Sequence, residues 1–289
     1  MIVDIIITGL INGSSYALLA IGFSLIFGVA RIVNIAHTAF YMVASYCIYT
    51  AFHKFHLNPV LAMLGAVVVT TIIGIVTYKI FIQPIREHEA VVLIATIALA
   101  IALQESMMLI FTGEFLSVPP LVAGYTTILG VKIFYQHLVT FASVLVILMG
   151  LHLFLEKTKL GLAIRATAQD REVANLMGMN EARLATVTVA VSVALAAFTG
   201  SVIAPLSIVE PFMWLHPLIM MMAVVVLGGL GSIKGSFYAA YILGFAESII
   251  VFTLPMGSFL KGSVALSIMI LVLLIRPEGL FGIAFEEER

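Results

Sequence analysis

The amino-acid sequence predicts an all-α protein that forms a polytopic bundle of membrane helices, and three observations support this prediction. Of the 289 residues, 62% are hydrophobic and 10% are charged, whereas about 25% of the residues in an average soluble domain are charged. Apolar stretches with few or no charges recur along the whole chain. The basic residues between these stretches are divided unevenly between the two sides of the membrane that the stretches define.

Nine apolar segments are candidate membrane-spanning helices. A bilayer core about 30 Å thick requires about 20 apolar residues in helical form, because lipid offers the backbone no hydrogen-bond partner. The nine segments are residues 5–30, 35–52, 57–78, 90–112, 138–155, 184–206, 211–231, 235–254 and 262–275. The seventh contains Pro217 and ends in a glycine-rich stretch, and the ninth is short. We therefore expect about eight to ten spans, some of them broken or re-entrant.

Lysine and arginine residues predict the orientation, because short cytoplasmic loops retain positive charge. Of the 14 basic residues, 11 fall on one side, including Arg289, and three fall on the other, namely Lys54, Lys132 and Lys261. We therefore expect the N-terminus outside and the C-terminus inside. The first apolar segment follows Asp4 rather than a basic region, so we expect it to be a retained span and not a signal peptide.

Two loops of the single predicted domain, residues 1–289, are long enough to have a role of their own. The external loop, residues 113–137, is stiff and mostly uncharged and is expected to be a connector. The cytoplasmic loop, residues 156–183, holds five basic and four acidic residues. Its apolar residues from Leu160 to Met177 recur at helical spacing and predict one short amphipathic helix, which ends at Gly178. Such a helix either rests on lipid headgroups or docks on a soluble partner.

Four sequence blocks carry a resemblance to a known family. Residues 172–178, EVANLMG, resemble the signature of ABC importer permeases, in which a Glu, a nearby Ala and a Gly six residues after the Glu form the coupling helix. The flanking residues and three further blocks resemble the LivH-type branched-chain amino acid permeases; these blocks are GLAIRA at 161–166, MN at 179–180, FGVARIVNIAH at 27–37, GGLGS at 228–232 and RPEGLFG at 276–282. The chain departs from the family pattern at Thr38, where the family usually has glycine.

The resemblance implies a membrane subunit of a bacterial importer in the cytoplasmic (inner) membrane. In this family, two permeases form the path, two cytoplasmic ATP-binding subunits drive transport, and an extracytoplasmic binding protein delivers leucine, isoleucine or valine. By this resemblance, coupling to the ATPase falls to Arg165, Glu172, Ala174 and Gly178. Charge reversal at Glu172 should then impair coupling, whereas the same change at Glu286 in the tail should matter little.

We expect no catalytic residue, cofactor or metal in this chain, and ATP hydrolysis in separate subunits. The stretch GSIKGS at residues 231–236 has the residue types of a phosphate-binding loop, but its lysine precedes the glycine instead of following it. The net charge of −1 gives no electrostatic basis for a nucleic-acid partner. The lipid bilayer is the expected surrounding of the chain.

Four polar residues within or beside the predicted spans are candidates for the translocation path. Asn34 and His37 lie one helical turn apart at the entry to the second span, and Glu105 and Glu247 lie inside otherwise apolar spans. Acids within the membrane face water, a partner or a pathway, because exposure to lipid is costly. Structural hydrogen-bond networks between helices are the alternative role for all four residues.

Other functions remain open at this stage. In an ion-coupled secondary transporter, the acids within the spans would carry the coupling ions, and no soluble motor would be needed. An ABC permease for another small solute, such as urea or an amide, would share the same blocks. The cytoplasmic loop favours an ATP-driven permease over a secondary transporter, because only the ATP-driven class requires an exposed docking helix.

Overall fold

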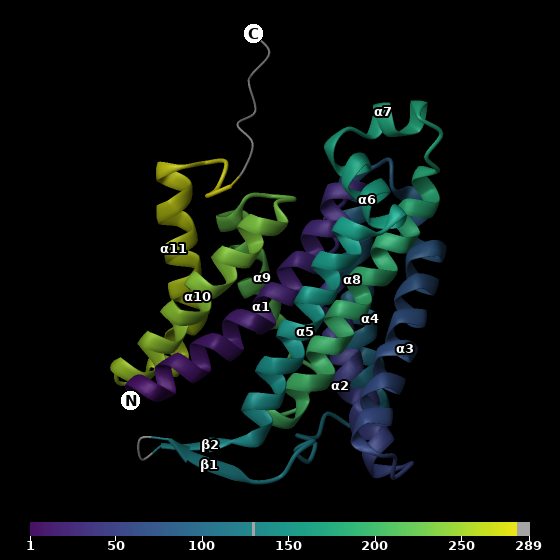
Figure 1. The fold of residues 1–289 in the computed structure, drawn as a ribbon. Helices are drawn as coiled ribbons and strands as arrows, with labels where there is room; N and C mark the ends of the chain where they lie inside the picture. The colour runs from purple at the N-terminus through teal and green to yellow at the C-terminus, as the bar shows by residue number, and fades with distance from the viewer. Residues whose placement is uncertain (129–130, 282–289) are drawn as a thin grey trace.

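Most of the described chain is helical and only two short strands are present in it, which confirms the predicted all-α class (Figure 1). The computed structural model describes residues 1–128 and 131–281, so Glu286 and Arg289 lie outside the described residues. The helices and strands are α1 Ile2–Ala30, α2 His37–His53, α3 Pro59–Thr77, α4 Glu89–Phe111, β1 Tyr125–Ile128, β2 Val131–Phe134, α5 Tyr135–Lys157, α6 Lys159–Gln169, α7 Arg171–Leu176, α8 Glu181–Ile203, α9 Leu215–Gly228, α10 Ile233–Thr253 and α11 Lys261–Ile275.

All nine predicted spans are helical, and within the described residues seven helical segments are long and apolar enough to cross a membrane. Two of the nine predicted spans correspond to helices that fall short of the about 20 residues of a full crossing, namely α2 with 17 residues and α9 with 14, and neither is among the seven. The segment with Pro217 is thus shorter than expected, since α9 begins only at Leu215. The ninth segment is longer, because the 3-10 turn Gly257–Leu260 precedes α11. The chain is a multi-pass helical membrane protein.

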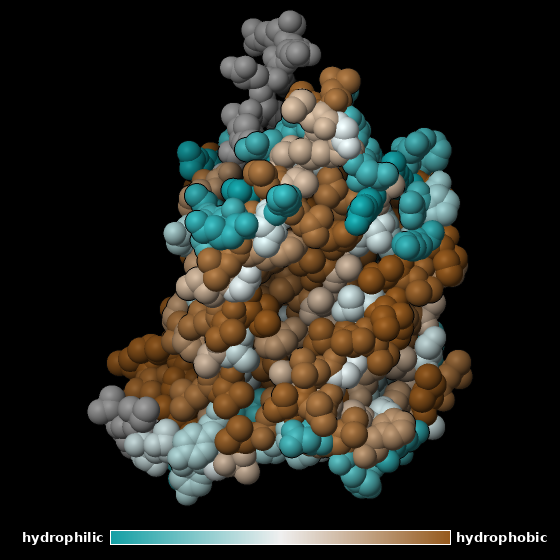
Figure 2. Space-filling view, turned by 45° about the vertical axis from the view of Figure 1, so that its right-hand side comes forward, coloured by the Kyte–Doolittle hydropathy of each residue, from teal (hydrophilic) through white to brown (hydrophobic). Residues whose placement is uncertain are grey.

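The helix α1 forms the centre of the bundle. In its most apolar stretch 83% of the residues are buried, against 22% in each of α3, α4 and α5. Small residues allow α1 and α10 to approach closely, because a Cβ atom on Gly244 would lie 2.6 Å from the Cα atom of Gly13. Figure 2 shows apolar side chains in a broad band across the visible face and polar side chains toward its two ends. This arrangement suits a lipid-facing outer layer around a packed centre.

The two ends of the bundle carry different elements (Figure 1). The N-terminus lies at the same end as β1 and β2, which we call the hairpin end. The short helices α6 and α7 lie at the opposite end, which we call the α7 end. The two long loops therefore lie at opposite ends of the molecule.

The loop at the hairpin end contains an antiparallel β-hairpin that was not predicted from the sequence. In this hairpin Tyr125 pairs with Phe134 across the two strands. The same loop is tied to the chain before α9 by two backbone hydrogen bonds between Leu116 and Val209, at 3.0 and 2.9 Å. Strands of four residues are too short to give a clear alternating pattern, so the sequence indicated only a stiff connector.

Candidate functional site

At the α7 end, the predicted coupling loop folds as two helices rather than one. Asp170 leaves the helical region, with φ −148° and ψ 109°, and its carboxylate accepts a hydrogen bond of 3.0 Å from the backbone N–H of Val173. Asp170 is therefore the N-cap of α7, a position for which Asp is strongly preferred. The expectation of one continuous helix was wrong, because this cap competes with helix continuation at the same residue.

The end of α7 is as predicted. Gly178 has φ +81°, in the left-handed region that favours glycine. Its N–H bonds to the carbonyl of Asn175 at 2.9 Å, and the N–H of Met179 bonds to the carbonyl of Ala174 at 3.1 Å. These two bonds form a Schellman motif, which satisfies the last carbonyls of the helix.

The surface of α7 combines exposed apolar side chains with an exposed acid. Leu176 and Met177 are 86% and 76% exposed, and Val173 is 53% exposed. Glu172 is also exposed, whereas Ala174 is buried beneath the helix. A helix that turns its apolar side chains outward beyond the end of a bundle provides a surface suited to a protein partner.

The preceding helix, α6, is held close to the bundle. Its N-cap Thr158 accepts a hydrogen bond of 2.9 Å from the N–H of Gly161. A Cβ atom on Gly161 would lie 2.5 Å from the Cα atom of Leu155 in α5, so only glycine fits this close approach. Ile164 faces inward and is buried, whereas Arg165 is exposed. Arg165 of α6 and Glu172 of α7 are thus both exposed at the α7 end.

Glu181, the first residue of α8, connects this region to the rest of the bundle. It pairs with Arg86 between α3 and α4 at 2.9 Å, and it also pairs with Arg171 in α7. The side chain of Asn175 donates a further hydrogen bond of 3.3 Å to the same carboxylate. Sequence reasoning did not identify Glu181 as a site residue, because Arg86 is distant in the chain and nothing in the local pattern indicates the pairing.

We expect replacement of Glu181 by Gln to loosen α7 without unfolding the bundle. Hydrogen bonds to charged groups contribute about 1.5–3 kcal/mol, and partial exposure of Arg171 reduces this value. The amides of α7 should then exchange with solvent about tenfold faster. Hydrogen-exchange mass spectrometry measures the rate, and Glu172→Gln, at an exposed acid, is the matched control. Equal exchange in both variants would show that the Glu181 contacts do not hold α7.

The α7 end also contains a cavity of about 580 Å³. Three of the four sequence blocks meet there, and the lining residues are Phe27, Gly28, Arg31, Ala168, Val226, Leu230, Gly231, Ser232, Pro277, Glu278 and Phe281. A Cβ atom on Gly28 would lie 3.5 Å from the Cβ atom of Ala168, so α6 lies directly against the end of α1. The N–H of Leu280 bonds to the carbonyl of Leu227 at 2.8 Å and fastens the segment after α11 to the end of α9.

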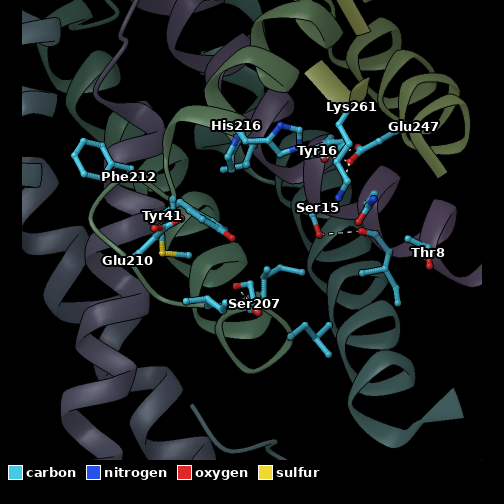
Figure 3. Close-up of a pocket in the computed structure, with 18 of the residues that line it drawn as sticks. Thr8, Ser15, Tyr16, Tyr41, Ser207, Glu210, Phe212, His216, Glu247 and Lys261 are labelled. Atoms are coloured by element: carbon cyan, nitrogen blue, oxygen red, sulfur yellow. Dashed lines mark hydrogen bonds and ion pairs between the residues drawn. The ribbon is translucent and has the colours of Figure 1, made fainter. Parts of the chain in front are cut away.

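The hairpin end contains a cavity of about 450 Å³, which we call the hairpin-end cavity (Figure 3). It lies between the first half of α1, the segment from the end of α8 to the start of α9, and residues from α10 and α11. The lining residues are Thr8, Ile11, Asn12, Ser15, Tyr16, Leu19, Tyr41, His137, Ile203, Leu206, Ser207, Ile208, Glu210, Phe212, Met213, His216, Pro217, Glu247 and Lys261. The wall of this cavity therefore combines polar and apolar side chains.

The predicted path residue Glu247 forms the centre of a hydrogen-bonded cluster on one wall of this cavity. The hydroxyl of Tyr16 donates to Oε2 at 2.6 Å, while His216 Nε2 and Lys261 Nζ each lie 3.5 Å from Oε1. Glu247 is almost fully buried, whereas His216 and Lys261 are partly exposed. Burial of a carboxylate is favourable only when it is paired and hydrogen-bonded. Tyr16 hydrogen-bonds Oε2, whereas Oε1 lies near Lys261 and His216 but has no hydrogen-bond partner among the described residues.

The other predicted path residues lie elsewhere. Asn34 and His37 are fully buried, and they do not line the hairpin-end cavity. The ring of His37 lies against α1, because a Cβ atom on Gly22 would be 3.0 Å from it. Thr38, which replaces the family-typical glycine, is also fully buried, so its side chain occupies part of this core.

Glu105 lies on the exposed face of α4 and does not line the hairpin-end cavity. Its Oε1 atom accepts a hydrogen bond of 3.1 Å from Gln104, and Gln104 accepts one of 2.8 Å from the indole N–H of Trp214. These two hydrogen bonds join Glu105 and Gln104 of α4 to Trp214, the residue before α9. Among the described residues, no group of three or more His, Cys, Asp or Glu could hold a metal ion.

The chain is similar over nearly its full length to proteins named as branched-chain amino acid transport permeases. It is 31% identical to the high-affinity branched-chain amino acid transport system permease protein BraD of Pseudomonas aeruginosa, with 96% of this chain and 94% of that protein covered. It is 27% identical to the corresponding protein LivH of Escherichia coli, with 95% and 93% covered. The probable branched-chain amino acid transport permease protein LivH of Methanocaldococcus jannaschii is 29% identical, with 96% and 92% covered.

A solved structure shares the fold. The complex of PsaBC from Streptococcus pneumoniae with Fab contains a chain that matches with a TM-score of 0.54 and 16% identity, covering 96% of this chain and 97% of that one. At this identity the match concerns the fold alone. Residues 5–275 match the family described as branched-chain amino acid transport system / permease component. Since this match spans almost the entire chain, the protein belongs to that family of permeases.

Proposed function

We propose that this chain is the membrane subunit of an ATP-driven importer and forms the translocation path for leucine, isoleucine and valine. The observation that carries the proposal is α7, whose apolar side chains are exposed at the end of the bundle opposite the hairpin-end cavity. An ATP-driven permease needs such a docking surface, because its motor is a separate protein. The substrate class is supported by the names of the relatives, BraD and LivH.

The proposed complex contains a second, homologous permease, two cytoplasmic ATP-binding subunits and an extracytoplasmic amino-acid-binding protein. In this assembly α7 docks on an ATP-binding subunit through its exposed apolar residues and Glu172. Arg165 on α6 lies in the same exposed region. Ala174 and Gly178 have a different role, because the first allows α7 to lie close to the bundle and the second ends the helix.

A continuous set of contacts leads from α7 to the hairpin-end cavity. Glu181 joins α7 to the start of α8, and Ala168 of α6 lies against Gly28 at the end of α1. α1 has 29 residues and is therefore about 43 Å long, and its opposite half lines the hairpin-end cavity. We propose that movement of α7 during the ATP cycle reaches this cavity through α6 and α1, since packed helices transmit displacement.

We place the chain in the bacterial inner membrane, with the hairpin end outside and the α7 end in the cytoplasm. The excess of basic residues on the α7 side supports this orientation. In a Cys47→Ala background, which removes the single cysteine, a thiol introduced by Glu114→Cys should react with an impermeant reagent added outside. A thiol introduced by Gln169→Cys should react only after the membrane is opened. The opposite result would reverse the orientation and remove the proposed contact with the ATPase.

The proposed function is tested by reconstituting the whole complex and measuring uptake and ATP hydrolysis together. We expect Gly178→Val to impair coupling, since a β-branched residue at φ +81° costs about 1 kcal/mol or more although no atom lies within 4 Å of the added Cβ. Glu172→Lys should also reduce coupled uptake. Glu87→Lys, at an exposed acid between α3 and α4, is the matched control. If both α7 variants assemble and transport at the wild-type rate, this loop is an ordinary connector.

A further inference from the structure

The hairpin-end cavity has charged groups on two separate walls (Figure 3). Lys261 and His216 lie on one wall beside Glu247, and Glu210 lies across the cavity from them. Within the described part of the chain, Glu210 takes part in no ion pair. Glu210 is half-buried and its side chain lines the cavity, so its carboxylate is available to a cationic group.

The wall that carries Lys261 and His216 can bind a further anion. Lys261 Nζ lies 3.5 Å from Glu247 Oε1, which is longer than the usual charge-assisted hydrogen bond of about 2.7–2.9 Å. An ammonium group has three donors and a single carboxylate oxygen uses only one of them. His216 lies at the same distance from Oε1 and is likewise partly exposed. Lys261 can therefore donate to a ligand carboxylate while Glu247 holds it in position. The ring of His216, whose Nε2 atom also lies 3.1 Å from the hydroxyl of Tyr16, borders the same space.

Apolar side chains also line the cavity. They come from α1, from the end of α8 and from the segment that leads into α9, and they include Ile11, Leu19, Ile203, Leu206, Ile208 and Met213. The volume of about 450 Å³ lies within the range of about 300–1,000 Å³ that is typical of small-molecule sites. A ligand suited to this cavity carries one anionic group, one cationic group and an aliphatic body.

We propose that the hairpin-end cavity is a binding site for a free aliphatic α-amino acid in its zwitterionic form. Lys261 and His216 receive the α-carboxylate, Glu210 receives the α-ammonium, and the aliphatic side chain contacts the apolar lining. Glu247 is a positioning residue, because it acts through the side chains of Lys261 and His216. This inference rests on the proposed function and extends it. It states that the permease itself, and not only a separate binding protein, recognises the α-carboxylate and the α-ammonium of the amino acid.

The test uses the permease complex with its ATP-binding subunits and without the binding protein. Isothermal titration compares three probes, namely L-leucine, 4-methylpentanoate, which lacks the ammonium, and 3-methylbutylamine, which lacks the carboxylate. We expect the wild-type complex to bind leucine about tenfold or more tightly than either analogue, as the loss of a charge-assisted contact implies. Glu210→Gln should remove only the preference over 4-methylpentanoate, and Lys261→Gln only the preference over 3-methylbutylamine.

The controls are charge removals at exposed residues outside the cavity, Glu114→Gln and Lys54→Gln, which should preserve both preferences.

A second measurement covers the case in which a charge variant fails to assemble. In a Cys47→Ala background with Ser207→Cys, leucine should slow thiol labelling at position 207 in the wall of the cavity, and neither analogue should do so at the same concentration.

Two outcomes would overturn the inference, namely no leucine binding by the complex without the binding protein, or unchanged preferences in both charge variants. If the complex with its binding protein still imports leucine in an ATP-dependent manner, the proposed function stands and only this site assignment is wrong. Absence of ATP-dependent leucine import by the complete wild-type system contradicts the proposed function itself.

Discussion

Replacement of Leu176 by Asp is expected to abolish ATP-driven uptake while the chain remains folded in the membrane. Leu176 is the most exposed of the apolar residues on α7, so the carboxylate costs little in the free subunit. In the docked complex the same carboxylate would be buried without a partner, which is strongly unfavourable. Loss of a central apolar contact at a protein interface costs about 2 kcal/mol or more, equivalent to about thirtyfold in affinity.

The measurement is co-purification of the ATP-binding subunits together with uptake into proteoliposomes. Leu162→Asp is the matched control, because Leu162 is an exposed leucine in the neighbouring helix α6. We expect this control to retain the ATP-binding subunits. Equal loss in both variants would mean that the interface is not centred on α7, and retention of full uptake in Leu176→Asp would contradict the docking role of this helix.

Replacement of Glu247 by Gln is expected to reduce uptake about tenfold or more with little loss of folded protein. The change removes the negative charge that holds Lys261 and lies beside His216, so both side chains lose their fixed position in the cavity. Tyr16 can still donate its hydrogen bond to the amide oxygen at the same place. Because the side chains of Lys261 and His216 are partly exposed, water can solvate them, and the thermal unfolding temperature should change by only a few degrees.

The comparison with Glu105→Gln separates a path role from a general effect of removing an acid within a span. Glu105 lies on the exposed face of α4, and its carboxylate is bonded only to Gln104 among the described residues. We expect Glu105→Gln to change uptake by less than about twofold, in line with surface substitutions of small effect. Loss of folded protein in Glu247→Gln, with normal uptake per folded molecule, would assign Glu247 to a structural network instead.

The path candidates illustrate how far sequence reasoning reaches. An acid in an apolar span is visible in the sequence, so Glu105 and Glu247 were equally strong candidates. Glu247 lines a cavity only because α1, α10 and α11 pack together. Its hydrogen-bond partner Tyr16 lies 231 positions away in the chain. Glu105 lies on the exposed face of α4 because of how this helix is rotated about its axis. Hydropathy does not reveal that rotation.

The sequence by itself determined the class of the protein, the approximate positions of its apolar helices and the glycine at which α7 ends. These features depend on local properties, namely the hydropathy of about 20 consecutive residues and the preference of Gly178 for positive φ. The tertiary structure decided the break at Asp170, the pairing of Glu181 with Arg86, and the formation of the hairpin-end cavity. These features arise from contacts between distant residues, and such contacts exist only after the helices have packed against one another.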